Sequence, residues 1–279
     1  MPSPATPRPL PIEPVSLVAI DLDGTLLLDD GVLSVRSAEA VAAAVDAGVR
    51  VVICTGRSPS SASYVYNALG LDTYMVAHNG ALVLHPRRGE VLQHHTLPAE
   101  LAQAVVRIAR SISPELSMGV EIGDKTVIGR RGGGLAVDPT IKDVSQQRSK
   151  LEDALREPVT KVMMTAPPQV LGDVQLALHH HLGDRISFAL SHMNLLQVVE
   201  GRVNKAEALT RVAARYGVMP AEVMAIGDAP NDREMMDWAG LSVAVGNAWP
   251  EIANRAHFTV PTNEQDGVAI ALQRYVLGP

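Results

Sequence analysis

The chain has 279 residues, 47% of them hydrophobic, and it carries a formal net charge of −6. Its length and composition indicate a soluble globular protein of one large or two modest domains, and no stretch approaches the roughly 18 consecutive apolar residues of a membrane span. Charges of both signs are scattered along it, and the single cysteine, Cys54, excludes an internal disulfide. We therefore expect a cytoplasmic protein that binds neither nucleic acid nor a membrane.

The first predicted strand covers residues 15–20 and follows a proline-rich stretch. Six prolines fall within the first fourteen residues and no apolar secretion signal is present there, so residues 1–13 are expected to form a flexible tail. The strand then breaks abruptly into Asp21, Leu22 and Asp23. Burying carboxylates is costly unless a cation or several donors face them, so this pair indicates a metal site, a reaction, or both.

Helices and strands alternate over the next part of the chain. We predict a helix at 34–47, a strand at 49–54, a helix at 59–69 and a strand at 73–77. Right-handed crossovers would join the strands into a parallel sheet, which places the polar residues that follow each strand along one edge. The second strand delivers Thr55, Gly56 and Arg57 to this edge, and the third delivers His78 and Asn79.

The pattern changes near residue 85. Two strand–helix–strand–strand units follow in series, over residues 91–130 and 159–200, with a long polar loop between them. Such units predict an antiparallel or mixed sheet that carries its helices on one face. We therefore expect residues 85–198 to form a separate α+β domain inserted into the first one.

The alternating pattern resumes after the insertion. Helices are predicted at 203–216, 231–239, 250–256 and 267–276, and strands at 223–226, 241–245 and 257–260. The first of these strands ends in the sequence GDAPND, which would bring Asp228 and Asp232 to the same edge as Asp21. Residues 14–84 and 199–279 are therefore expected to form one α/β domain around a doubly wound parallel sheet.

Four carboxylates, those of Asp21, Asp23, Asp228 and Asp232, would meet at this edge. They would repel one another, and oxygen-only ligands of this charge suit a hard cation such as Mg2+, which normally keeps several waters and a substrate phosphate. The metal would mask the negative charge that keeps a carboxylate away from a phosphoryl group, so one aspartate could act as nucleophile. A hydroxyl, a few backbone N–H groups and a lysine such as Lys205 would complete a phosphoryl-transfer site.

Four short motifs carry a resemblance to a known family. DLDGT at 21–25, CTGR at 54–57, NK at 204–205 and GDAPND at 227–232 resemble, in this order, the motifs of the haloacid dehalogenase superfamily of phosphatases. AHNGA at 77–81, EGRVNKAEAL at 200–209, AVGNA at 244–248 and DGVA at 266–269 are similar to its Cof-type subfamily. The resemblance implies a Rossmann-like core with a C2-type α/β cap inserted between the second and third motifs.

The resemblance also implies roles for individual residues. Asp21 would attack phosphorus to give an aspartyl-phosphate, and Asp23 would protonate the leaving oxygen and then activate water. Thr55 and Lys205 would hold the phosphoryl oxygens. The expected ligands of Mg2+ are Asp21, the backbone carbonyl of Asp23, and Asp228, with Asp232 supporting the site.

Further residues are candidates for contact with phosphate or substrate. Near the expected site they are Gly56, Arg57, Asn79 and Asn231, and for Arg57 and Asn79 structural hydrogen bonding is an equal alternative. In the inserted domain Glu121, Arg130 and Arg131 are weaker candidates. The tract His179–His181 resembles a metal site, but it lies near the end of a predicted helix, where imidazoles suit the helix dipole, so we interpret it as ordinary helix surface.

These observations favour a Mg2+-dependent phosphomonoesterase. Its substrate would be a small phosphorylated metabolite, such as a sugar phosphate or a phosphorylated cofactor. One alternative is a phosphomutase of the same superfamily. Another is a non-enzymatic, phospho-accepting signalling module, because receiver domains also array Asp, Thr and Lys on a doubly wound sheet. The chain length, the large insertion and Asp23 count against the signalling module. No pattern in the sequence indicates an oligomeric state.

Overall fold

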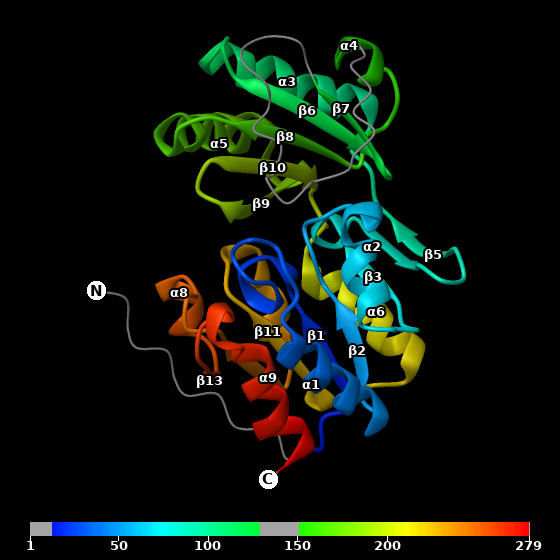
Figure 1. Cartoon of the computed structure of the whole chain (residues 1–279). Helices are drawn as coiled ribbons and strands as arrows, with labels where there is room; N and C mark the ends of the chain where they lie inside the picture. The colour runs from blue at the N-terminus through cyan, green and yellow to red at the C-terminus, as the bar shows by residue number, and fades with distance from the viewer. Residues whose placement is uncertain (1–12, 129–150, 279) are drawn as a thin grey trace.

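The computed structural model describes residues 13–128 and 151–278, and these ranges form two stacked domains (Figure 1). The predicted tail, apart from Glu13, and the candidate residues Arg130 and Arg131 lie outside the described residues. A membrane-spanning helix is absent from the described ranges, because none of their helices is both long enough and apolar enough. The chain enters and leaves the upper domain by two neighbouring connections.

The lower domain is built on a five-stranded parallel sheet with the order β13-β12-β11-β1-β2. Its strands are β1 (Leu17–Ile20), β2 (Arg50–Ile53), β11 (Val223–Gly227), β12 (Leu241–Ala244) and β13 (Phe258–Thr259). The strands β1 and β11 are apolar and buried along their whole length because both faces of the sheet are covered. Ile20 on β1 is level with Ile53 on β2 and Ile226 on β11, so these three strands end at the same edge.

Helices cover both faces of this sheet, as the sequence predicts. One face packs against α1 (Val35–Asp46), α2 (Pro59–Ala68) and α9 (Gly267–Leu272). The other packs against α6 (Lys205–Tyr216), α7 (Arg233–Trp238) and α8 (Pro250–Ala253). Polar side chains fix where the helices begin: Ser34 accepts from the N–H of Ser37, and Asn204 accepts from the N–H of Glu207.

A small antiparallel sheet lies beside β2. It contains β3 (Met75–Ala77), β4 (Leu82–His85) and β5 (Glu90–His94), and one parallel bridge between Cys54 and Val76 connects it to the main sheet. The prediction that residues 91–97 begin the inserted sheet is wrong for β5, because a short turn keeps β5 paired with β4 and Leu92 packs against the lower domain. Leu97 does belong to the upper domain, where it bridges to Val159. The boundary expected at 84/85 therefore cuts this hairpin, and the one expected at 198/199 falls within a strand of the upper sheet.

The upper domain holds a five-stranded sheet with the order β7-β6-β8-β10-β9, in which all neighbours are antiparallel. Its strands are β6 (Ser117–Ile122), β7 (Lys125–Ile128), β8 (Lys161–Thr165), β9 (Ile186–His192) and β10 (Leu195–Glu200). Its helices are α3 (Ala99–Ile112), α4 (Leu151–Ala154) and α5 (Pro168–Leu182). The two long helices, α3 and α5, lie on the face turned away from the lower domain (Figure 1). The tract His179–His181 is exposed on the last turn of α5.

Strand periodicity divides the residues of the upper sheet between its two faces. On β8, Val162 and Met164 pack under the helices, and on β10 Leu196 and Val198 do the same. Because successive side chains of a strand point to opposite faces, the intervening residues face the lower domain. Those residues include Lys161 and Gln197, so the face above the lower domain is partly polar.

Candidate active site

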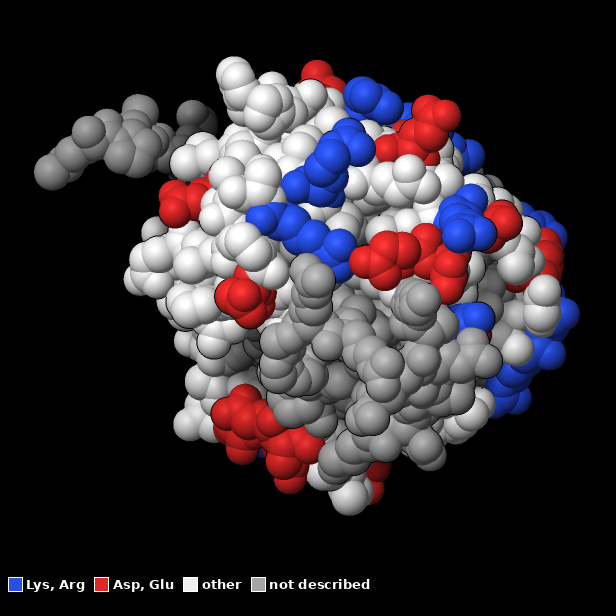
Figure 2. All heavy atoms as spheres, turned by 90° about the horizontal axis from the view of Figure 1, so that it is seen from above, with Lys and Arg blue, Asp and Glu red and all other residues white. Residues whose placement is uncertain are grey.

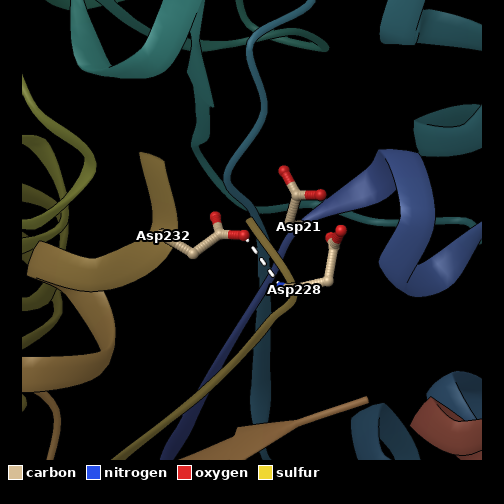
Figure 3. Close-up of side chains that lie close together, drawn as sticks. All are labelled: Asp21, Asp228 and Asp232. Carbon is tan, nitrogen blue, oxygen red and sulfur yellow. Dashed lines mark hydrogen bonds between the residues drawn. The ribbon is translucent and has the colours of Figure 1, made fainter. Parts of the chain in front are cut away.

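Asp21 and Asp228 lie side by side because they follow two neighbouring parallel strands, β1 and β11 (Figure 3). Asp232 is the last residue of a short helical turn, Pro230–Asp232, in the loop that begins at Asp228. One carboxylate oxygen from each of the three residues lies within 4.8 Å of the others. The structure thus brings together three of the four carboxylates that the sequence predicts at one edge of the sheet. The carboxylate of Asp23 instead binds Arg57.

A buried lysine, Lys205, holds two of these acids. Its Nζ donates to Asp21 Oδ1 at 2.5 Å and to Asp232 Oδ1 at 2.6 Å. Lys205 is the first residue of α6, so the helix start fixes its position. Burial alone would lower the pKa of Lys205, but the two carboxylates outweigh it and raise that pKa above its ordinary value. The other oxygen of Asp232 accepts the backbone N–H groups of Asp228 and Ala229 at 3.0 and 3.1 Å.

Lys205 balances only part of the negative charge of these three acids. Burial raises the pKa of Asp21 well above its ordinary value; Lys205 opposes that rise, while Asp232 and Asp228 add to it. Burial and the neighbouring Asp232 raise the pKa of Asp228 to about 7, although Thr25 Oγ1 donates to Asp228 Oδ1 at 2.6 Å. Excess negative charge on oxygen ligands alone fits a hard divalent cation.

Gly24 keeps room for this arrangement. Its φ is +77°, and a Cβ at this position would lie 2.7 Å from Asp228 Oδ2. A residue with a side chain would therefore have to displace the carboxylate. The carboxylate oxygens, the raised pKa values of Asp21 and Asp228, and the close approach of Gly24 all agree with a candidate cation site. Asp21 and Asp228 would be its ligands, and Asp232 would support them.

Asp23 pairs with Arg57. The guanidinium donates from Nε to Asp23 Oδ2 at 2.9 Å and from Nη2 to Oδ1 at 2.5 Å. It also donates to the Tyr64 hydroxyl at 3.2 Å. The Arg57 side chain is 1% exposed and that of Asp23 is 18% exposed, so only the acid is open to solvent. For Arg57 the structure shows the structural hydrogen bonding that was one of the two expectations.

The turn that follows β2 lies beside the acids. Thr55 is fully buried; its N–H donates to the Val76 carbonyl at 2.8 Å, and its Oγ1 accepts the N–H of Arg57 at 3.1 Å. Asn79, in the left-handed region at φ 58°, donates its N–H to the Thr55 carbonyl at 2.9 Å. Its side-chain oxygen accepts from Asn231 Nδ2, also at 2.9 Å. The candidate residues of the lower domain are therefore contiguous.

A pocket opens between the two domains above these residues. The lower domain lines it with Asp21, Asp23, Gly56, Arg57, Ser58, Ala229 and Asn231, and the upper domain with Glu121, Lys161, Met163, Leu195 and Gln197. Glu121 was expected as a candidate, whereas Lys161 and Gln197 were missed. A charged or amide residue within an otherwise apolar strand, as in KVMMT and LLQVVE, is the signal that could have found them.

The lower domain is thus an α/β domain with buried acids at the ends of its parallel strands, and an inserted antiparallel sheet covers this acidic site. The family profile described as haloacid dehalogenase-like hydrolase matches residues 18–272. The chain therefore belongs to the haloacid dehalogenase-like hydrolase family, and the expected fold and Cof-type membership are confirmed.

Named relatives resemble the chain over most of its length. It is 32% identical over 266 residues to the 5-amino-6-(5-phospho-D-ribitylamino)uracil phosphatase YitU of Bacillus subtilis, covering 93% of this chain and 97% of that protein. It is 30% identical over 236 residues to an HMP-PP phosphatase of Escherichia fergusonii, covering 85% and 86%. A crystal structure of a haloacid dehalogenase-like hydrolase from Bacteroides thetaiotaomicron superposes with a TM-score of 0.80 at 26% identity, covering 93% and 99%.

Proposed function

We propose that the protein is a Mg2+-dependent phosphatase that hydrolyses a phosphate monoester of a small metabolite through an aspartyl-phosphate on Asp21. The observation that carries the proposal is the buried cluster of Asp21, Asp228 and Asp232 around Lys205, with Asp21 lining the pocket between the domains. The two relatives named above are phosphatases of phosphorylated small molecules, which supports the same substrate class here.

The first step is the attack of a carboxylate oxygen of Asp21 on phosphorus. A new bond forms between that oxygen and phosphorus while the ester P–O bond breaks, and Asp23 gives its proton to the leaving oxygen. In the second step Asp23 takes a proton from water, whose oxygen attacks the phosphorus of the aspartyl-phosphate. The bond between phosphorus and the Asp21 oxygen breaks, which releases inorganic phosphate and restores the Asp21 carboxylate. Asp23 suits both steps because Arg57 orients it and because it lines the pocket.

The remaining residues hold charge and position. Lys205, already bound to Asp21, balances the negative charge as a phosphoryl group approaches. The Thr55 oxygen accepts the Arg57 N–H, so its own hydroxyl hydrogen is left to bond a phosphoryl oxygen. Asp21 and Asp228 would hold Mg2+ with Asp232 supporting them; when bound, the ion supplies neutralisation of the phosphate and nucleophile charges.

The surface supports a small partner rather than a polyanion. Seen from the side of the upper domain, Lys and Arg residues are interspersed with Asp and Glu over the described part of the surface (Figure 2). Charges of both signs on that part differ from the uniformly basic footprint that is usual for nucleic-acid binding. The pocket between the domains would instead take a metabolite.

The test is the release of phosphate from p-nitrophenyl phosphate in the presence of Mg2+. Asp21→Asn should lower kcat about a thousandfold or more, because the amide cannot attack phosphorus. Asp46→Asn, at an exposed position on α1, is the matched control and should leave kcat unchanged. Chelation with EDTA should abolish the activity of the unaltered protein, and excess Mg2+ should restore it. Full activity in Asp21→Asn would refute the assignment.

A further inference from the structure

A buried ion pair lies where the upper domain lines the pocket. Glu121 on β6 lies directly opposite Lys161 on β8 in the antiparallel register, and Lys161 Nζ is 2.9 Å from Glu121 Oε2. Their side chains are only 2% and 4% exposed. Burial alone would raise the pKa of Glu121, but Lys161 and His78 outweigh it and lower that pKa to about 2. The carboxylate is therefore charged, and it holds the ammonium in one place.

Lys161 has three partners within the protein, one in an ion pair and two in hydrogen bonds. Besides Glu121, its Nζ donates to Gln197 Oε1 at 2.7 Å and to the backbone carbonyl of Gly56 at 2.8 Å. An ammonium group has three N–H bonds and no more. Two of them are used in these hydrogen bonds and Glu121 Oε2 lies 2.9 Å from the same nitrogen, so Lys161 is held by the protein although it lines the pocket.

The bond to Gly56 crosses from the upper to the lower domain and fixes one peptide unit. The carbonyl of Gly56 and the N–H of Arg57 belong to the same planar peptide. While Lys161 holds the carbonyl, that N–H donates to Thr55 Oγ1 at 3.1 Å. Rotation of this peptide would break both bonds at once, so the orientation of the Thr55 hydroxyl depends on Lys161.

The lower domain anchors the ion pair in return. His78 Nδ1 lies 2.9 Å from Glu121 Oε2, and its Nε2 lies 3.0 Å from the Gly123 carbonyl. The backbone N–H of His78 donates to the Arg57 carbonyl at 3.0 Å. The turn after β2 is thus connected to the upper domain twice, through Lys161 and through His78, and both of these residues contact Glu121.

We propose that Lys161 is a positioning residue for phosphate binding, which acts by holding the Gly56–Arg57 peptide and through it the hydroxyl of Thr55. The inference rests on the proposed function, because it takes Thr55 as a phosphate ligand. It makes the upper domain part of the phosphate site without any contact between Lys161 and the substrate. The turn has all of its hydrogen bonds only while the two domains lie together.

The experiment measures kcat, KM and the inhibition constant of inorganic phosphate, which contains no organic group that the upper domain could contact. Lys161→Met should raise both KM and the phosphate inhibition constant about tenfold, the loss expected for one charge-assisted hydrogen bond. Lys125→Met, which removes an exposed lysine of the same sheet, should change neither. An unchanged phosphate inhibition constant in Lys161→Met would overturn the inference.

A double-mutant cycle separates positioning from a general structural effect. If Lys161 acts through Thr55, then Lys161→Met should add less than twofold to the rise caused by Thr55→Val alone. Independent, multiplying losses would overturn the inference. Should Lys161→Met fail to fold because Glu121 is left unpaired, the pair variant Lys161→Met with Glu121→Gln takes its place in both measurements. Retained activity in Asp21→Asn refutes the proposed function instead, so the two failures are distinguishable.

Discussion

Arg57 donates two hydrogen bonds to the carboxylate of Asp23, from Nε to Oδ2 at 2.9 Å and from Nη2 to Oδ1 at 2.5 Å. The two residues lie in the loops that follow the adjacent strands β1 and β2. A planar guanidinium meets a carboxylate at two points, so it sets the orientation of the acid. The acid–base residue of the proposed reaction is therefore positioned by a side chain that is itself almost fully buried.

Arg57→Lys tests this relationship. The lysine keeps a positive charge but loses the two-pronged contact, so Asp23 should shift and kcat should fall about 10- to 100-fold with little change in KM. Steady-state kinetics with p-nitrophenyl phosphate measures both constants. Arg36→Lys, at a side chain that is 63% exposed, serves as the control. A rise in KM at constant kcat would instead assign Arg57 to phosphate binding, the other role expected from the sequence.

Lys205→Met should destabilise the protein by about 3–5 kcal/mol in EDTA, because it leaves the buried Asp21 and Asp232 without their cation. Urea unfolding followed by circular dichroism measures the loss. Adding Asp232→Asn to Lys205→Met should recover part of the stability, since one unpaired charge is then removed. A single variant as stable as the unaltered protein would show that Lys205 does not compensate these acids.

The lower domain and most of its site are predictable from the sequence because one local signal marks each piece. An apolar run that ends abruptly in acids marks a buried parallel strand, and this signal found Asp21 and Asp228, although about two hundred residues separate them. Side-chain roles were harder to predict. Asp232 and Lys205 were expected at the site, but their hydrogen bonds were not. One oxygen of Asp232 accepts from Lys205, and the other accepts from backbone N–H groups.

The residues that the sequence did not reveal depend on pairing between strands. Periodicity predicts that Lys161 and Val162 point to opposite faces, but it does not say which face meets the other domain. The contact of Lys161 with Gly56 joins residues on different domains, which no local pattern encodes. The partner of β5 was missed for a related reason, because the short turn after β4, and not the composition of β5, decides its pairing.

The raised pKa of Asp228 predicts how stability depends on pH without metal. Its pKa rises from an ordinary 3.8 to about 7 in the folded protein, with burial as the main cause. Between these values the folded state holds a proton that the unfolded chain has released, so this group makes stability fall as pH rises toward about 7 and level off above it.

Urea unfolding in EDTA at several values between about pH 5 and about pH 8 should show this decline, and Asp228→Asn should make it shallower, with Asp21, whose pKa is also raised, causing the remainder. Mg2+ binds the ionised carboxylate, so it should stabilise the unaltered protein more at the upper end of this range than at the lower end. Equal stabilisation by Mg2+ at both ends would argue against Asp228 as a ligand.

Two glycines allow a test of the cation site with a closely matched control. Gly24 and Gly31 have nearly the same φ, +77° and +79°, so replacing either with alanine should cost about 1–2 kcal/mol of backbone strain. Only at Gly24 does the added Cβ meet a neighbour, Asp228 Oδ2 at 2.7 Å, whereas nothing lies within 4 Å of a Cβ at Gly31. Gly24→Ala should therefore raise the Mg2+ concentration needed for half-maximal activity about tenfold or more, while Gly31→Ala leaves it unchanged. If both variants respond alike, backbone strain and not displacement of Asp228 controls the response to Mg2+.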